Sequence, residues 1–433
     1  MRKLATCIVL LFAAVNTIFS QELPEIIPHN PEVSALGKYG DIPIGYFTGV
    51  PNISIPLVTL QGQNMNIPVS ISYHASGIRV SEIASRVGLG WSLSAGGAVT
   101  RSMRGIPDDT PGAGYLYTNY TVQSLLDNVA DQGYVLTMLN DSSEGLLDLE
   151  SDMYSYNIMG YSGKFHFNQS GAIITHPDGD DKIVPVKIND VIRGWQITTK
   201  EGIIFYLGLS KDHTREANDT SNPTGTSVNI AGGYSIPTPG TYTTNYISSW
   251  QLMELEMPSG ESFSFEYQSS SIEFWNLGGQ RKYFGVTGSG NCFQNDVPTS
   301  YSINSDFTHR LTRINGKTGY ILLNYDQPRL DLVNDFALTG VQLYNNHDQL
   351  VDQYQLEYDY FISTQHLNTN TFGNTDQRRK RLYLKRIVQT IAGTENQAHS
   401  FAYNTDHILP DRLSFAQDAW GYYNGQSNGL FYP

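Results

Sequence analysis

The sequence is poor in charge, in cysteine and in long apolar runs, and each shortage excludes a class of protein. Only 16% of the 433 residues are charged, and 27 Lys and Arg stand against 41 Asp and Glu. Nucleic acid is bound by clustered cations, so this balance argues against a nucleic-acid partner. Two cysteines, Cys7 and Cys292, cannot build a disulfide framework. The abundance of Tyr (28) and Gly (40) favours turn-rich β structure over surface helices.

The one long apolar run lies at the N-terminus, from Leu4 to Phe19, after the positive start Met1-Arg2-Lys3. It predicts a secretory signal peptide over residues 1–20, cleaved near Ser20-Gln21. The run is too short for a comfortable membrane span, which needs about 20 apolar residues. We therefore expect a secreted or cell-surface protein without an integral membrane segment. Cleavage also removes Cys7, and the role of Cys292 stays open.

Period-two alternation dominates the rest of the chain. Apolar residues share one face over 53–57 and again over 67–73, with a turn at Gln61-Gly62-Gln63-Asn64, which predicts a hairpin. Only 121–132 shows helical spacing, in Val122, Leu125, Leu126 and Val129. The fold class that we predict is all-β: antiparallel hairpin and meander sheets with at most one or two short helices.

Composition divides the chain after the signal peptide into three regions. Residues 21–120 form an N-terminal β region. Residues 121–260 form a second β region with one short helix and a long polar excursion at 212–245, rich in Asn, Thr, Ser, Gly and Pro. Residues 261–433 form β-hairpin repeats, which we expect to continue beyond the end of the chain.

A glycine-dense block surrounds a single tryptophan in the first region. Such spacing suits backbone that passes close to backbone beneath a large ring. We predict a structural tryptophan knot formed by Gly88, Gly90, Trp91, Gly96 and Gly97.

The third region repeats a strand that ends in a Tyr-Asp-like tetrad at unequal intervals. We predict that each tyrosine anchors a hairpin, with its ring packed inward and its hydroxyl bonded to a partner. The tyrosines are Tyr267, Tyr325, Tyr358 and Tyr403, and Trp420 is a further expected structural residue. Because one hairpin cannot bury its apolar face alone, such repeats need neighbours.

Four segments together resemble the N-terminal region of secreted Rhs (YD-repeat) proteins of Gram-negative bacteria. The resemblance covers essentially the whole mature chain. Its opening block is specific, whereas the Tyr-Asp tetrads alone are a weak signal. The segments are Gly49-Val50-Pro51-Asn52-Ile53-Ser54-Ile55-Pro56-Leu57, Ile71-Ser72-Tyr73-His74-Ala75-Ser76-Gly77-Ile78-Arg79-Val80, Val87-Gly88-Leu89-Gly90-Trp91-Ser92-Leu93 and Asp418-Ala419-Trp420-Gly421-Tyr422-Tyr423-Asn424-Gly425.

The resemblance implies a function. In such proteins tandem β-hairpins coil into a hollow shell, and a variable C-terminal segment, often a toxin, lies inside it or follows it. This chain lacks the dense repeats, the core and the variable tip of the longer family members. The chain is then either a leading fragment or a short stand-alone relative, and we favour the fragment, whose partners would be downstream Rhs repeats and a cargo or toxin domain, all absent here. A toxin activity does not carry over, because no toxin segment is present.

Candidate chemistry is weak throughout the sequence, and we expect no catalytic residues, no cofactor and no metal. Gly90-Trp91-Ser92-Leu93-Ser94 lacks the second glycine of a nucleophile elbow. Asp178-Gly179-Asp180-Asp181 lacks the spaced ligands of a calcium loop and favours a polar turn. The ten histidines show no metal-ligand spacing.

Two further features have alternative interpretations. The basic run Arg378-Arg379-Lys380-Arg381 favours a solvated turn over a protease site. Trp250, Trp275 and Trp420 favour core positions over sugar stacking.

The sequence therefore predicts a non-enzymatic structural module, the N-terminal part of an Rhs-type shell. Two alternatives stay open: a cell-surface adhesin or glycan-binding protein, and a secreted hydrolase.

Overall fold

The computed structural model of the chain describes residues 49–144, 146–228, 245–280, 285–286, 292–293, 299–363, 375–391 and 394–428. It divides into two units, Met1–Pro51 and Asn52–Pro433, and nearly all described residues belong to the second. The predicted signal peptide at 1–20 lies outside the described residues. Strands dominate the second unit, which confirms the all-β fold class.

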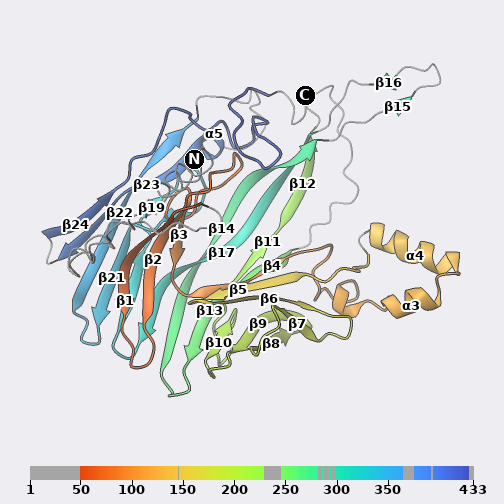
Figure 1. Cartoon of the computed structure of the whole chain (residues 1–433), viewed down its shortest axis with the longest axis horizontal. Helices are drawn as coiled ribbons and strands as arrows, with labels where there is room; N and C mark the ends of the chain where they lie inside the picture. Colours follow the sequence, from red (N-terminus) through yellow and green to blue (C-terminus); the bar gives the residue numbers. More distant parts are fainter. Residues whose placement is uncertain are drawn as a thin grey trace, which may run out of the picture. The chain divides into compact units, whose positions relative to one another are not determined.

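A small antiparallel sheet is formed by β1 (Asn52–Leu60), β2 (Ile67–His74) and β3 (Trp91–Ser94). Ile55 of β1 pairs with Ile71 of β2, so the predicted hairpin is confirmed. The ladder shifts register between Pro56 and Val58, because a proline has no N–H to donate. This sheet lies in front of the longer strands in Figure 1, and β1 packs against β18, β21 and β22.

The longer strands pair antiparallel in chain order, and this part holds the predicted repeats. The strands are β13 (Tyr246–Glu256), β14 (Ser262–Gln280), β17 (Thr299–Gly316), β18 (Gly319–Asn324), β21 (Gly340–Asn345), β22 (Leu350–Ile362), β23 (Lys380–Ile391) and β24 (Thr394–Ser400). Two short pairs accompany them: β15 (Gly285–Val286) with β16 (Cys292–Phe293), and β19 (Gln327–Pro328) with β20 (Phe336–Ala337).

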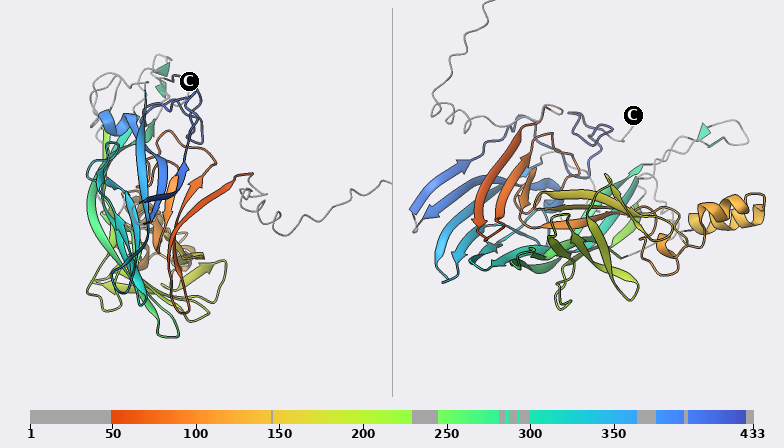
Figure 2. Two further views of the ribbon diagram at one scale, coloured as in Figure 1. Left: turned by 90° about the vertical axis from the view of Figure 1, so that its left-hand side faces the viewer. Right: turned by 60° about the horizontal axis from the view of Figure 1, so that its bottom comes forward.

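The remaining strands join this sheet through β13. On one side β4 (Gly97–Ser102) pairs with β13 and leads to β5 (Met153–Ile158), β6 (Tyr161–Phe167) and β7 (Ile173–His176). On the other side β8 (Lys182–Ile188), β9 (Val191–Thr198) and β10 (Ile204–Leu207) reach β13 in that order. The two views in Figure 2 show this group below and beside the tall strands.

Two strands lie inside the segment that we predicted as a polar excursion. β11 (Asn218–Ser221) pairs with β13 and β17, and β12 (Pro223–Val228) pairs with β17. Their residues are polar because Ser, Thr and Asn can occupy a ladder whose hydrogen bonds come from the backbone alone. Residues 229–244 of that segment lie outside the described residues.

The helical prediction differs from the structure in number and position. Helix α3 (Val122–Asp127) begins with a capping box at Thr121, and α4 (Gln132–Ser143) begins at Asp131, whose side chain accepts hydrogen bonds from the next turn. Of the predicted segment 121–132, only Val122–Asp127 forms the expected helix, and a second helix that was not predicted begins where the segment ends, because Asp131 is a further N-cap residue. A third helix, α5 (Thr375–Arg379), precedes β23, and a 3₁₀ turn η1 covers Tyr115–Tyr117.

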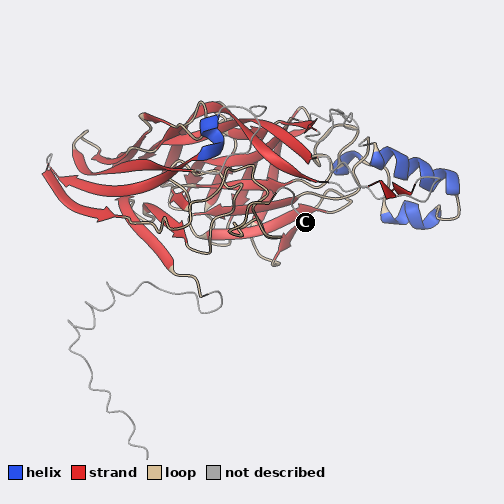
Figure 3. Cartoon of the chain, turned by 90° about the horizontal axis from the view of Figure 1, so that it is seen from above, coloured by secondary structure: helices blue, strands red, loops and turns tan. Residues whose placement is uncertain are grey.

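The apolar face of the first of these helices is not buried. The exposed fractions of Val122 and Leu126 are 61% and 64%, and Val129, in the turn after the helix, is 69% exposed. Figure 3 shows α3 and α4 projecting beyond the strands. Within the described part of the chain, no helix has the length and apolar character needed to cross a membrane.

Candidate functional site: aromatic and buried-charge locks

Trp91 lies at the centre of an aromatic cluster that joins β3 to the segment just after β24. Its side chain is buried, and its ring lies 5.1 Å from that of Tyr73 and 4.8 Å from that of Phe401. The indole Nε1–H donates to the hydroxyl of Tyr403 at 2.9 Å, and this hydroxyl donates to the Leu384 carbonyl at 2.7 Å. One relay of hydrogen bonds thus ties β3, the segment after β24, and β23.

Close contacts, one with backbone and one with a side-chain ring, account for two of the predicted glycines beside the tryptophan ring. Gly88 has a φ of +105°, and a Cβ there would lie 2.7 Å from the Leu384 nitrogen. Gly90 has a φ of +74°, and a Cβ there would lie 2.7 Å from the Tyr73 ring. Any other residue would meet both strain and a clash at these positions.

The other two glycines lie further along, between β3 and β4. A Cβ on Gly96 would meet the Phe265 ring at 3.5 Å, and one on Gly97 would lie 2.5 Å from the Asn157 carbonyl oxygen. They therefore face β14 and β5. The structure does not place the four glycines around one tryptophan, because each of them contacts a different residue.

The tetrad tyrosines share a geometry that the sequence only outlined. Three of them donate their hydroxyl to a backbone carbonyl 15 to 20 residues earlier, at 2.6–2.7 Å. Tyr267 donates to Leu252, Tyr358 to Leu338 and Tyr403 to Leu384. Each bond joins the tyrosine's segment to an earlier one and satisfies a carbonyl that is buried with the ring.

Tyr325 belongs to the same series but meets a different partner. Its ring packs against the core, and the guanidinium of Arg310 lies 5.7 Å from the ring centroid. Burial raises the pKa of Tyr325 to about 12, and the pKa of Tyr403 to about 12 for the same reason. These hydroxyls therefore remain protonated donors across the physiological pH range.

A second candidate site, the arginine cluster, connects several irregular segments with α5 and the start of β23. It consists of Arg86, Arg329, Asp331, Asp335, Arg378, Arg381, Asp411 and Arg412, all buried except the half-buried Arg86. Arg329 binds both carboxylate oxygens of Asp331, at 3.0 and 2.9 Å, and one of Asp335 at 3.0 Å. Arg86 binds the other oxygen of Asp335 at 2.8 Å.

The arginines of this cluster also donate to backbone carbonyls. Arg329 donates to Ala84, and Arg381 donates to both Val80 and Pro410, all at 2.8 Å. Arg412 donates to Gln377 at 3.1 Å. The bond from Arg381 to Val80 joins segments 301 residues apart, and the carbonyls of Val80, Ala84 and Pro410 all lie outside helices and strands.

The predicted solvated turn at Arg378-Arg379-Lys380-Arg381 is therefore wrong for two of its arginines. Arg378 is 4% exposed and Arg381 is 1% exposed, so neither is open to a protease. Burial and the charge of Arg412 lower the pKa of Arg381 to about 10, and burial lowers the pKa of Arg412 to about 10. Both guanidinium groups remain charged at neutral pH because carbonyls and carboxylates surround them.

A third lock, the aspartate cluster, holds the loop between β4 and η1. Its members are Arg101, Asp108, Asp109, Asp148 and Asp152, all buried. Asp108 and Asp152 each accept a hydrogen bond from the other's backbone N–H, at 2.9 and 3.1 Å. Arg101 donates to Asp109 at 2.7 Å and lies 3.4 Å from Asp152.

Carboxylates outnumber cations in the aspartate cluster, and this changes their protonation. Burial, with the charge of Asp152, raises the pKa of Asp108 to about 7. Burial raises the pKa of Asp148 to about 6. A group whose pKa is near neutrality exchanges its proton within the ordinary pH range.

Trp420 does not occupy the core position that the sequence predicted. It is 73% exposed, at the tip of a loop in which the Asp418 carboxylate accepts the N–H of Trp420 and of Tyr422, both at 2.9 Å. These hydrogen bonds hold the backbone of the loop, and the indole ring lies in solvent. Trp250, by contrast, is fully buried, as expected.

The remaining candidate chemistry does not assemble into a reactive site. Asp181 accepts the hydroxyl of Tyr156 at 2.6 Å, and His166 and His176 share a hydrogen bond of 3.0 Å between their rings. Over the described residues, no three His, Cys, Asp or Glu side chains come together in a way that could hold a metal ion. The Cys292 side chain lies outside what the structure describes.

Sequence reasoning missed both buried-charge locks. One signal was present: Asp108-Asp109 and Asp331 lie in loops beside arginines, and buried charge requires a partner of opposite sign. The pairing itself depends on segments that are far apart in the chain.

Comparison with known proteins gives distant structural likenesses and no family. No family model matches the chain, and no curated protein matches it. Among solved structures, the TcdB2-TccC3 complex covers 84% of this chain at 12% identity and a TM-score of 0.39. The Photorhabdus luminescens Tc holotoxin pore covers 82% at 11% identity and a TM-score of 0.41. The N-terminal domain of effector protein SpvB from Salmonella typhimurium strain LT2 covers 81% at 10% identity and a TM-score of 0.32.

The chain spans 16% of the length of the TcdB2-TccC3 and holotoxin chains, and 99% of the SpvB domain. With TM-scores this low, the all-β assignment rests on the strands of the chain itself.

Proposed function

We propose that this chain is a secreted, non-enzymatic structural module: the N-terminal part of an Rhs-type β shell that encases or presents a C-terminal cargo. The observation that carries the proposal is the repeated tyrosine lock. Three tetrad tyrosines, two in strands and one just after β24, donate their hydroxyls to a carbonyl of an earlier segment. The bond recurs at three of the four tetrads, and a wall built from successive similar hairpins is expected to repeat such a contact.

The proposed mechanism is containment. Paired strands satisfy their own backbone, and the arginine and aspartate clusters satisfy the backbone of the segments between them. The resulting wall is stiff and closed to water at its centre, with side chains used for fastening. Such a wall separates a cargo from its surroundings without reacting with it.

The resemblance of the opening block and of the segment 418–425 to Rhs proteins supports the same role, as does the signal-peptide pattern at 1–20. On this proposal the downstream repeats and the cargo belong to the same assembly. The chain reaches it through export, and mass spectrometry of the secreted protein should find Gln21 at its N-terminus.

The proposal is tested on the native protein. Antibodies raised against residues 52–433 capture it from the culture fluid of the source organism, and electron cryomicroscopy images the particles. We expect a hollow particle whose wall contains β13–β24 and which encloses further polypeptide. A solitary particle of the mature chain with nothing attached would contradict the shell.

The non-enzymatic part has its own test. Polysaccharide, ester and peptide substrates are incubated with the purified mature chain. We expect no turnover above that of a heat-denatured sample. Turnover that one carboxylate or serine substitution abolishes would replace the proposal with the hydrolase alternative.

A further inference from the structure

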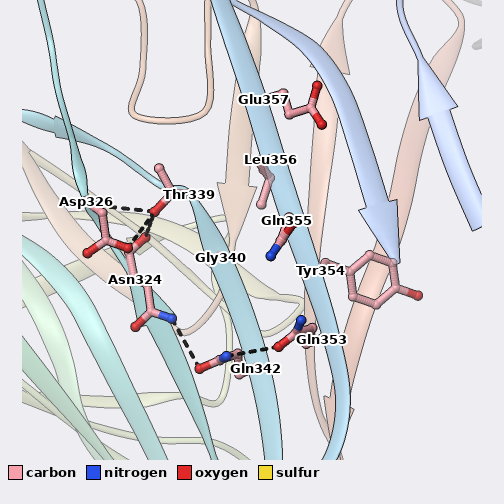
Figure 4. Close-up of a pocket in the computed structure, with 10 residues that line it drawn as sticks. All are labelled: Asn324, Asp326, Thr339, Gly340, Gln342, Gln353, Tyr354, Gln355, Leu356 and Glu357. Carbon is pink, nitrogen blue, oxygen red and sulfur yellow. Dashed lines mark hydrogen bonds between the residues drawn. The ribbon is translucent and has the colours of Figure 1, made fainter. Parts of the chain in front are cut away.

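A polar groove of about 380 Å³ crosses β18, β21 and β22 on the face of the sheet that points away from the core. The two faces are distinguished by alternation: Ile321, Leu323 and Val341 belong to the core, whereas their neighbours Asn324 and Gln342 line the groove. Its volume lies within the range of about 300–1,000 Å³ that small-molecule pockets occupy. Figure 4 shows the lining residues.

The groove exists because a glycine takes a side-chain position on this face. Gly340 pairs with Asn324 on one side and with Gln355 on the other. Its φ lies outside the left-handed region, so the backbone does not require glycine there. A Cβ at this position would make only ordinary contacts, the nearest being Asn324 Nδ2 at 3.4 Å. Glycine at this position therefore matters because it leaves the place of a side chain empty. The backbone there does not need a conformation that only glycine can adopt.

A ladder of side-chain amides fixes one wall of the groove. Asn324 Nδ2 donates to Gln342 Oε1 at 3.2 Å, and Gln342 Nε2 donates to Gln353 Oε1 at 3.0 Å. Gln353 Nε2 then donates to Thr390 Oγ1 of β23 at 2.7 Å. Each amide has two N–H donors and two acceptor lone pairs, so the ladder orients every amide and uses only part of its capacity.

Carboxylates lie at the rim beside these amides. Asp326 accepts the hydroxyl of Thr339 at 3.2 Å, and Glu357 lies at the far end of the lining. The lining contains no lysine or arginine, so phosphate, sulfate and nucleic acid have no counter-charge. Its two apolar side chains are Leu356, which is 4% exposed, and Tyr354, and both pack against the core, so the groove offers a lipid or steroid less apolar surface than such a ligand needs.

We infer that this groove binds a neutral oligosaccharide. Sugar hydroxyls both donate and accept, and amides and carboxylates held in a fixed array match pairs of adjacent hydroxyls at little entropic cost. The inference goes beyond the shell proposal and does not depend on it, since a wall module and an isolated chain would present the same face.

The test uses the mature chain and four neutral probes: maltohexaose, cellohexaose, chitohexaose and mannohexaose. Saturation-transfer NMR detects binding, and isothermal titration calorimetry gives the Kd. We expect at least one probe to bind, with an affinity that does not change between low and high salt because the ligand carries no charge. If the folded protein binds none of the four, the inference is wrong.

Gly340→Val fills the groove and is expected to weaken binding of that probe by about tenfold or more, the equivalent of roughly 1.4 kcal/mol. Asn324→Ala removes the end of the ladder and should weaken binding by a similar factor. Gln397→Ala is the matched control, since Gln397 is an exposed amide on β24 away from the groove. Circular dichroism shows whether each variant is folded. Binding that survives both groove variants would place the sugar elsewhere and overturn the inference.

Discussion

The arginine cluster and the aspartate cluster perform the same task with opposite charge in excess. In the arginine cluster, guanidinium groups donate to the carbonyls of Val80, Ala84 and Pro410. In the aspartate cluster, carboxylates accept from backbone N–H groups such as those of Arg104 and Ile192, both at 2.7 Å. The arginine cluster therefore supplies donors to backbone carbonyls, and the aspartate cluster supplies acceptors to backbone N–H groups. Both kinds of group would otherwise be left without a partner.

The difference between them lies in what happens to the excess charge. A buried carboxylate can lose its charge by binding a proton near neutral pH, whereas a guanidinium group remains charged there. The aspartate cluster can thus respond to pH, and the arginine cluster has to be compensated permanently by its partners. Buried charge without such partners is among the largest destabilising effects known in proteins.

The largest expected effect comes from removing the central cation of the arginine cluster. Arg329→Met leaves the buried carboxylate of Asp331 without its bidentate partner. The free energy of unfolding should fall by about 3–5 kcal/mol, measured by urea denaturation. Adding Asp331→Asn should recover part of the loss, because the uncompensated charge is then gone.

An exposed pair provides the control for this prediction. Arg193 and Glu216 also form an ion pair, but their side chains are 39% and 35% exposed. Arg193→Met should cost less than about 1 kcal/mol. If Arg329→Met costs no more than Arg193→Met, the arginine cluster does not hold the fold together.

A neutral anchor next to the arginine cluster separates packing from charge. Trp91→Ala should lower the free energy of unfolding by about 3–5 kcal/mol, because a fully packed indole is replaced by a cavity. Trp91→Phe keeps most of the ring contacts and loses the hydrogen bond to Tyr403, so it should cost less. Urea denaturation measures both. A loss below about 1 kcal/mol for Trp91→Ala would mean that the ring is not an anchor.

The aspartate cluster should make stability depend on pH. Burial raises the pKa of Asp108 to about 7 in the fold from its usual 3.8, so the folded state binds more protons than the unfolded state between these two pH values. Its contribution to stability is complete below the unfolded pKa and is lost as the pH rises toward 7. Between about pH 5 and pH 7.5, Asp108→Asn should remove about 2 kcal/mol of this decline.

Urea denaturation at several pH values compares the slopes of the wild type and the variant. Arg381→Met is the matched change in the other cluster. Because the pKa of Arg381 is about 10, this substitution should leave the slope over the same interval unchanged. Equal slopes for wild type and Asp108→Asn would remove the contrast between the two clusters.

The sequence predicted the parts of the molecule that follow from local alternation. The β1–β2 hairpin and the all-β class were read from period-two patterns, since a strand exposes its faces in strict alternation. The hydroxyl bonds of Tyr267 and Tyr358 follow from the same logic, because a buried ring brings a polar tip that needs a partner. These features need only a few consecutive residues.

The misplaced features depend on contacts that are distant in the sequence. From its neighbours in the sequence Arg381 is expected at the surface, because its acceptors, the carbonyls of Val80 and Pro410, belong to other segments of the chain. Trp420 is expected in the core from its residue type alone, but it lies in a hydrogen-bonded loop with its ring exposed. The groove at Gly340 requires the register of three strands, which no single strand reveals. Pairing between distant segments is set by tertiary packing and leaves no local pattern.

The smallest effect concerns the tyrosine locks, which satisfy carbonyls as the arginines do but without a charge. Tyr358→Phe keeps the buried ring and leaves the Leu338 carbonyl without the hydroxyl that donates to it at 2.6 Å. The free energy of unfolding should fall by about 1–3 kcal/mol, the cost of an unsatisfied buried acceptor. Because no ion is involved, the loss should be the same at low and high salt, whereas that of Arg193→Met should shrink as salt screens its exposed pair. Denaturation of both variants at two salt concentrations measures this, and a salt-dependent loss for Tyr358→Phe would show that the neutral lock depends on the neighbouring charges after all.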